Sequence, residues 1–120
     1  MTSWKLGLLN LYYHSTYPYR WLRNRTWSAA GRAPAIVLFY HRVADSDPNP
    51  WTISNPLFKQ QMRWLKSHFD LVSLEETQRR IQSGLSFRPS VAITFDDGYA
   101  ENCQQALPLL IEERIPCTYF

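Results

Sequence analysis

The sequence predicts an α/β fold with parallel strands, specifically the first half of a (β/α) barrel. Apolar segments typical of strands alternate about three times with segments of helical periodicity, and this alternation is typical of parallel α/β sheets and barrels. The last strand segment reaches the end of the chain with no helix after it. A complete barrel takes roughly 200–250 residues, whereas this chain has 120.

Two segments have the composition of strands that are buried on both faces. Residues 35–40 (AIVLFY) and 91–95 (VAITF) are continuous apolar runs, and such runs, rich in β-branched and aromatic residues, are typical of central parallel strands. Shorter strand candidates lie at residues 70–72 and 117–120. We therefore expect four strands, two of them long.

Three segments carry helical periodicity. The first two also have a residue pattern typical of a helix start, and the third contains a proline. Pro56 suits a first helical turn, because its fixed φ is helical and its missing N–H is not needed there. Ser73 and Glu76 have the spacing of a capping box, which satisfies free N–H groups at a helix start. Pro108 would interrupt a helix interior. We expect helices at residues 55–69, between Ser73 and Gly84, and at residues 102–114.

The first residues differ from the rest in charge and aromatic content. Six of the thirteen basic residues and none of the ten acidic ones lie within residues 1–44. Trp4, Leu8 and Leu11 have the spacing of a short amphipathic helix. One interpretation is peripheral contact with a membrane surface, where aromatic rings lie among the headgroups and arginines near anionic lipid. The other is a helix that packs on the outside of the domain.

This contrast divides the chain into a basic, aromatic-rich leader, residues 1–33, and a folded domain, residues 34–120. The domain has more acidic than basic residues, so we expect no nucleic-acid partner, which would need a basic folded face. The leader lacks a clear signal peptide, because Asn10 breaks its apolar run and no small-residue cleavage site follows closely. A cytoplasmic or membrane-associated location is therefore favoured.

The triplet Asp96, Asp97 and Gly98 directly follows the second long strand. Active sites of parallel α/β proteins assemble at the carboxyl ends of the strands. Two adjacent carboxylates repel each other, and a divalent cation relieves this by neutralising one and leaving the other to act as a base. The same triplet also occurs in ordinary turns, so the composition alone leaves both interpretations open.

Several segments in the expected order resemble the N-terminal portion of the polysaccharide deacetylases, also called the NodB homology domain or carbohydrate esterase family four. The strand and triplet VAITFDDGY resemble the first motif of that family, and VLFYHRV is similar to its opening strand. The resemblance covers about residues 35–120. The similar segments are residues 37–43, 56–65, 71–76, 91–99, 105–110 and 115–120.

The resemblance implies a distorted (β/α) barrel and a metal-dependent hydrolase that removes acetyl groups from N-acetylated sugars of a polysaccharide. Asp96 matches the catalytic base of the family, and Asp97 matches its carboxylate ligand to a divalent metal, usually zinc. The other metal ligands of the family are two histidines four residues apart, a spacing that the three histidines of this chain do not have. We therefore expect the remaining ligands beyond Phe120 and an inactive 120-residue chain.

His41 ends the first long strand, at the same edge of the sheet as the two aspartates. We expect it to bind the glycan substrate, the alternative being a hydrogen-bonded histidine that closes the strand. Trp51 either stacks on a sugar ring or anchors its loop on the core. Two other functions stay open: a non-catalytic fragment or degenerate homologue, and metal-assisted phosphoryl transfer, since strand-end aspartates also bind magnesium.

Overall fold

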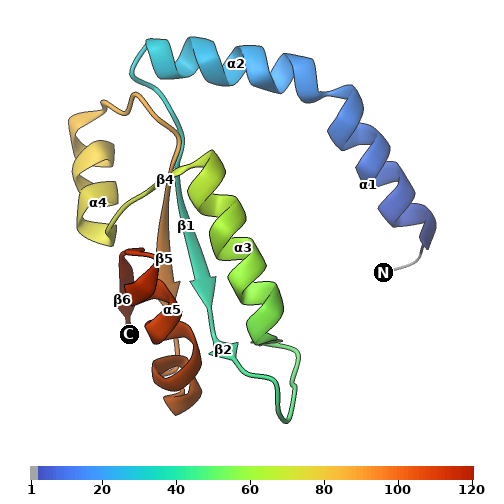
Figure 1. Cartoon of the computed structure of the whole chain (residues 1–120). Helices are drawn as coiled ribbons and strands as arrows, with labels where there is room; N and C mark the ends of the chain where they lie inside the picture. The colour runs from blue at the N-terminus through green and yellow to red at the C-terminus, as the bar shows by residue number, and fades with distance from the viewer. Residues whose placement is uncertain (1–2) are drawn as a thin grey trace.

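The computed structural model describes residues 3–120 of the chain (Figure 1). In chain order, the elements are α1 (Ser3–Ser15), α2 (Tyr17–Ala29), β1 (Ala35–Tyr40), β2 (Arg42–Val43), β3 (Thr52–Ile53), α3 (Asn55–His68), β4 (Asp70–Leu71), α4 (Leu74–Ser83), β5 (Ser90–Phe95), the π-helix η1 (Asn102–Ala106), α5 (Leu107–Glu112) and β6 (Cys117–Tyr119).

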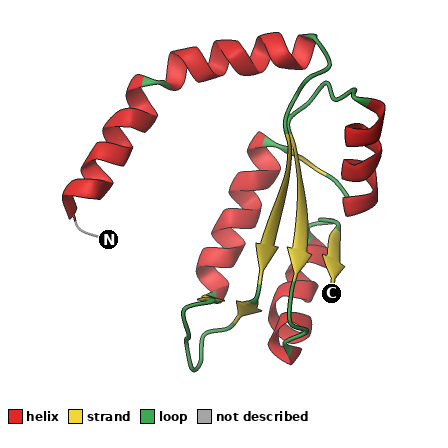
Figure 2. Ribbon diagram, turned by 180° about the vertical axis from the view of Figure 1, so that it is seen from behind, coloured by secondary structure: helices red, strands yellow, loops and turns green. Residues whose placement is uncertain are grey.

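A parallel sheet around β5 organises the domain (Figure 2). β1 pairs along one side of β5, from Ala35 opposite Ser90 to Tyr40 opposite Phe95. On the other side, β4 pairs with the first residues of β5, and β6 pairs with the last ones. Helices lie between successive strands of this sheet. The predicted α/β class with parallel strands is confirmed, and the arrangement fits the first half of a (β/α) barrel.

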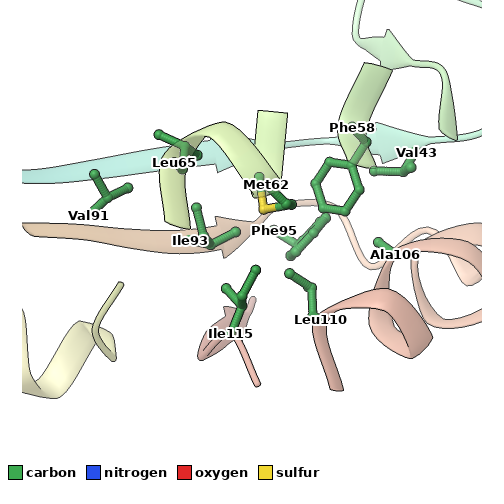
Figure 3. Close-up of a cluster of buried hydrophobic side chains, with 10 residues drawn as sticks. All are labelled: Val43, Phe58, Met62, Leu65, Val91, Ile93, Phe95, Ala106, Leu110 and Ile115. Carbon is green, nitrogen blue, oxygen red and sulfur yellow. The ribbon is translucent and has the colours of Figure 1, made fainter. Parts of the chain in front are cut away.

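The core lies where β5 meets α3 and the segment that leads through α5 to β6 (Figure 3). All six residues of β5 are buried, because this strand has neighbours on both sides. Strand side chains alternate between faces, so every second residue of β5 joins the cluster. Replacing a buried phenylalanine of such a core by alanine typically costs about 3–5 kcal/mol. The buried side chains of the cluster are Val43, Phe58, Met62, Leu65, Val91, Ile93, Phe95, Ala106, Leu110 and Ile115.

The prediction that β1 is buried on both faces was wrong for the described chain. Leu38 and Tyr40 are half-buried and pack against the core, but Val37 is 45% exposed and Phe39 is 61% exposed. These two side chains point to the opposite face, which stays open within residues 3–120. A continuous apolar run shows that a strand suits burial, but it does not show which of its faces a neighbour covers.

The helix signals agree with the structure except in the third helix. The Ser73 hydroxyl accepts a hydrogen bond from the Glu76 N–H at 3.1 Å, and Gly84 ends α4 with a φ of +65°. The predicted helix at residues 102–114 instead begins as the π-helix η1 and continues as α5. Pro108 lies in the first turn of α5, the helix position that proline tolerates best.

Residues 3–29 form two helices, α1 and α2, where the sequence predicts one short helix. The described side chains of α1 are exposed, and α2 contains no buried residue. The guanidinium of Arg20 links the two helices: it donates a hydrogen bond to the Tyr13 carbonyl at 2.6 Å and lies 4.1 Å from the centroid of the Tyr13 ring. No residue of α1 or α2 belongs to the buried core cluster.

The buried side chain of Asn102 connects the start of η1 to the segment after β1. Its Oδ1 accepts a hydrogen bond from the Val43 N–H at 2.8 Å, and its Nδ2 donates to the His41 carbonyl at 2.6 Å. Asn102 is fully buried, so water could not replace these hydrogen bonds without rearrangement. Asn102 therefore holds the backbone of residues 41–43 against the segment that follows β5.

We predict that Asn102→Ala lowers the free energy of unfolding by about 1–3 kcal/mol, because it leaves the buried Val43 N–H without a partner. Urea denaturation followed by circular dichroism measures this change. Gln104→Ala is the matched control, since Gln104 lies in the same π-helix with an exposed side chain and should change stability by less than about 0.5 kcal/mol. Equal effects of the two substitutions would contradict the role given to Asn102.

Candidate active site

The carboxyl ends of β1 and β5 lie side by side and bring two distant parts of the sequence together. The pair Tyr40 and Phe95 ends both strands at the same level. The Asp96 N–H extends the ladder by donating to the Tyr40 carbonyl at 2.9 Å. His41 directly follows β1, and Asp97 is the second residue after β5. This end of a parallel sheet is where α/β proteins assemble their active sites.

His41 and Asp97 are in direct contact. The Nδ1 of His41 lies 3.0 Å from the Oδ2 of Asp97. An ionised carboxylate can only accept a hydrogen bond, so the donor of this hydrogen bond is the Nδ1–H group of the imidazole. The side chain of His41 is 21% exposed and that of Asp97 is 64% exposed. The pair is therefore open to solvent at the edge of the sheet.

The turn after β5 directs the Asp97 carboxylate toward β1. Asp97 has a φ of +68° and Gly98 a φ of +50°, and both values lie in the left-handed region. Glycine adopts this region freely and aspartate tolerates it better than most residues. A non-glycine residue held there costs on the order of 1–3 kcal/mol, and such residues cluster at functional sites. The turn thus makes the contact with His41 at a local backbone cost.

Two aromatic rings flank the His41 imidazole. Its ring centroid lies 4.8 Å from that of Trp51 and 5.7 Å from that of Phe39, both in edge-on arrangements. Trp51 is 65% exposed, so it does not anchor its loop in the core, which is one of the two interpretations that its position allows. Trp51 instead forms an exposed aromatic surface beside the pair of His41 and Asp97.

Arg42 is buried and holds the loops around the site together. Its guanidinium donates to the Glu101 carboxylate at 2.8 Å and to the carbonyls of Ser46 and Asp47 at 3.0 and 2.7 Å. The hydrogen bonds from Arg42 lower the pKa of the Glu101 carboxyl, so this ion pair persists at neutral pH. Arg42 therefore connects the loop between β2 and β3 to the segment that precedes η1.

Of the three predicted site residues, the structure brings His41 and Asp97 into contact and places the half-buried Asp96 beside them. Their roles as substrate-binding residue, metal ligand and base remain predictions. The sequence interpretation missed Arg42 and Asn102 as supports of the site, because the hydrogen bonds by which they join the two segments connect residues 59 to 61 positions apart in the chain. The one available signal was an arginine two residues after an apolar strand segment.

The donors at this edge of the sheet do not form a complete metal site among the described residues. Within residues 3–120, no three histidine, cysteine, aspartate or glutamate side chains come together in a metal-binding arrangement. A zinc site usually has at least three protein ligands. Asp97 keeps one carboxylate oxygen besides the one that accepts the hydrogen bond from His41. The described residues therefore suit a single carboxylate ligand and not a complete coordination shell.

Comparison with known proteins identifies relatives of one kind. Residues 86–120 match the family model described as polysaccharide deacetylase. The poly-beta-1,6-N-acetyl-D-glucosamine N-deacetylase of Staphylococcus epidermidis is 31% identical over 101 residues, which cover 72% of this chain and 35% of that relative. The protein of the same name from Staphylococcus aureus is 30% identical over 101 residues with the same coverage.

Solved structures share the fold. IcaB of Ammonifex degensii matches with a TM-score of 0.66 and 29% identity, covering 73% of this chain and 38% of that protein. A de-N-acetylase of Aggregatibacter actinomycetemcomitans matches with a TM-score of 0.60 and 30% identity, covering 71% and 36%. The chain spans a little over a third of the length of these relatives. As its motifs predict, the chain matches the N-terminal portion of the polysaccharide deacetylase family in both sequence and fold.

Proposed function

We propose that this chain is part of a metal-dependent hydrolase that removes acetyl groups from N-acetylated sugars of a polysaccharide. The observation that carries the proposal is the contact of His41 with Asp97 at the carboxyl end of β5, beside Asp96. Both aspartates lie within the segment that matches the family, residues 86–120. The names of the relatives favour a polymer of N-acetylglucosamine as the substrate.

Asp96 would act as the general base. Hydrolysis of an acetamide at neutral pH requires a group that takes a proton from the attacking water. Asp96 follows the last residue of the fully buried strand β5, and its backbone is fixed by the hydrogen bond to the Tyr40 carbonyl. Its half-buried position would leave the carboxylate within reach of water while the backbone stays in place.

Asp97 would bind the metal, and His41 would orient it. The hydrogen bond from the His41 Nδ1 fixes one carboxylate oxygen of Asp97, and partners of this kind orient ligating groups in metal sites. A bound divalent ion such as zinc would polarise the acetyl oxygen and lower the pKa of a bound water. The remaining ligands would come from outside residues 1–120, since the described residues offer only part of a site.

His41 and Trp51 would line the path of the glycan. With its Nδ1 directed at Asp97, His41 keeps its other ring nitrogen for contact with a sugar hydroxyl. The indole of Trp51 is 65% exposed, and aromatic rings offer a large apolar face to a flat partner such as a sugar ring. This arrangement places a binding surface directly beside the two aspartates.

We predict that the two aspartates respond differently to substitution in a protein that carries this chain together with the remaining metal ligands. Asp97→Ala removes a metal ligand, so metal content, measured by mass spectrometry, and deacetylation of N-acetylglucosamine oligomers should fall together. Asp96→Asn keeps the shape but removes the basic oxygen, so metal content should persist while turnover falls by roughly 10²–10⁴, the usual effect of losing a general base.

The 120-residue chain serves as the negative control for this assay and should show no deacetylation above a blank without protein. Near-parental turnover in Asp96→Asn would show that Asp96 is not the base. If both variants keep their metal and their activity, the triplet is only a turn and the proposed site is wrong.

We predict that Trp51→Ala raises the KM for N-acetylglucosamine oligomers by about 10-fold, the effect of losing roughly 1.4 kcal/mol of aromatic contact, with a smaller change in kcat. Trp51→Phe should restore most of the affinity, because it keeps an aromatic ring. Phe87→Ala is the matched control, since Phe87 is similarly exposed but lies in the loop before β5, at the other end of the sheet. Unchanged kinetics in Trp51→Ala would refute the sugar contact.

A further inference from the structure

The helices α1 and α2 form an exposed apolar surface, here called the leader surface and comprising the side chains of residues 4–29. Large apolar side chains occur along both helices, from Trp4, which is 63% exposed, to Tyr19, which is 67% exposed. None of the described side chains of the two helices is buried. Monomeric soluble proteins rarely expose such large apolar patches, which usually mark an interaction site.

The leader surface carries positive charge and no negative charge. Lys5, Arg20, Arg23 and Arg25 lie on it, and the first acidic residue of the chain is Asp45. None of these four cations forms an ion pair with a carboxylate within residues 3–120. The bases of α3 and α4, in contrast, include several that pair with Glu76 or Glu113. The excess charge of the leader is therefore available to an anionic partner.

The cations of the leader surface lie next to aromatic rings. The Arg23 guanidinium lies 5.0 Å from the Trp27 ring, the Arg25 guanidinium 4.8 Å from the Trp21 ring, and the Lys5 ammonium 5.7 Å from the Trp4 ring. Tryptophan and tyrosine are enriched at the level of lipid headgroups, because their rings are apolar with one polar edge. Arginine and lysine beside them can reach lipid phosphates while their stems cover apolar surface.

The composition of this surface complements a bilayer that contains anionic lipid. The surface has one sign of charge and a high density of tryptophan, tyrosine and leucine, which match anionic headgroups and the apolar region beneath them. Helices rich in tryptophan, leucine and basic residues can lie in the plane of the membrane interface. The predicted amphipathic character of the first helix was wrong, because the apolar side chains of α1 are distributed around the helix and not gathered on one face. Among residues 3–120, no helix has the length and apolar character that crossing a bilayer would require.

The position of the two helices is compatible with such contact. α2 lies across the end of the sheet at which β1 and β5 begin (Figure 1). His41 and Asp97 lie at the opposite ends of these strands. One side of α2, with Tyr17, Trp21 and Arg25, lines a hollow that it shares with Trp64 and Phe69 of the body. A bilayer would therefore contact the outward side of the leader surface and leave the edge that carries the candidate active site open to a glycan.

We propose that α1 and α2 dock this protein on an anionic phospholipid surface, with the tryptophans and leucines inserted at headgroup level and the lysine and arginines bound to lipid phosphates. The interaction does not depend on catalysis, so it can be tested whether or not the proposed function is correct.

The test is co-sedimentation of the full chain with vesicles of phosphatidylcholine alone and with vesicles that also contain phosphatidylglycerol, at low and high salt. The chain should bind the anionic vesicles selectively and lose binding at high salt. The triple variant Lys5→Gln, Arg23→Gln, Arg25→Gln should bind on the order of 10²-fold more weakly, since each basic residue near an anionic surface contributes about a factor of five. It keeps Arg20, which links the two helices.

The matched control carries Lys59→Gln, Arg63→Gln and Arg88→Gln, which remove the same charge from exposed positions outside the leader, and should bind like the parent. A second variant, Trp4→Ala, Leu8→Ala, Leu11→Ala, should also weaken binding, because it removes the inserted apolar groups. Circular dichroism confirms that each variant is folded.

A separate measurement locates the contact. With Trp51→Phe and Trp64→Phe, the remaining tryptophans all lie in α1 and α2, so brominated lipids should quench their fluorescence in anionic vesicles. Equal binding to neutral and anionic vesicles, absence of binding or quenching, or an equal loss in the control variant would each overturn the proposal.

Discussion

The parallel pairing of β1 with β5 is the constraint on which the rest of the structure depends. Six residue pairs in register end both strands at the same level, so the residues that follow them emerge at one edge of the sheet. His41 and Asp97 are 56 residues apart in the chain, and the register of the two strands is what brings their side chains into contact. The pairing is held in turn by the burial of β5, whose side chains form the centre of the core with α3.

The residues beyond this edge of the sheet need further support, because the pairing of β1 with β5 ends at Tyr40 and Phe95. Asn102 and Arg42 provide it through hydrogen bonds to backbone groups and to Glu101. Buried polar groups are costly when unpaired, so these contacts specify the loop geometry more sharply than apolar packing would. The left-handed turn at Asp97 fits this view, because the surrounding contacts hold a conformation that an isolated chain would avoid.

The two parts of the chain differ in the burial of their apolar side chains and in the pairing of their charges. The body, from β1 onward, combines a buried core with paired charges at its surface. The helices α1 and α2 have aromatic rings and cations but no carboxylates. This distribution agrees with the two proposals made above, in which the body carries the candidate active site and the two helices contact a lipid surface. The two helices are joined by Arg20 and Tyr13, so their mutual angle is set by their own residues.

Much of this protein could be read from its sequence, because the signals concerned are local. The continuous apolar run of residues 91–95 identified a buried strand, and the capping residues Ser73 and Gly84 located α4. The order of motifs pointed to the polysaccharide deacetylases, whose family model matches residues 86–120. The adjacent aspartates at a strand end were sufficient to nominate a site. These features depend on neighbouring residues and on backbone preferences that hold in any fold.

The tertiary structure decided what depends on distant contacts. Within residues 3–120, the face of β1 that carries Phe39 stays open, and Trp51 lies beside His41 and not in the core. Asn102 binds the backbone of residues 41–43 from a π-helix, where the periodicity had indicated an α-helix. None of these can be read locally, because each depends on which surface another segment covers. The sequence by itself determined the class of fold and nominated the residues of the candidate site, whereas packing decided how those residues lie relative to one another.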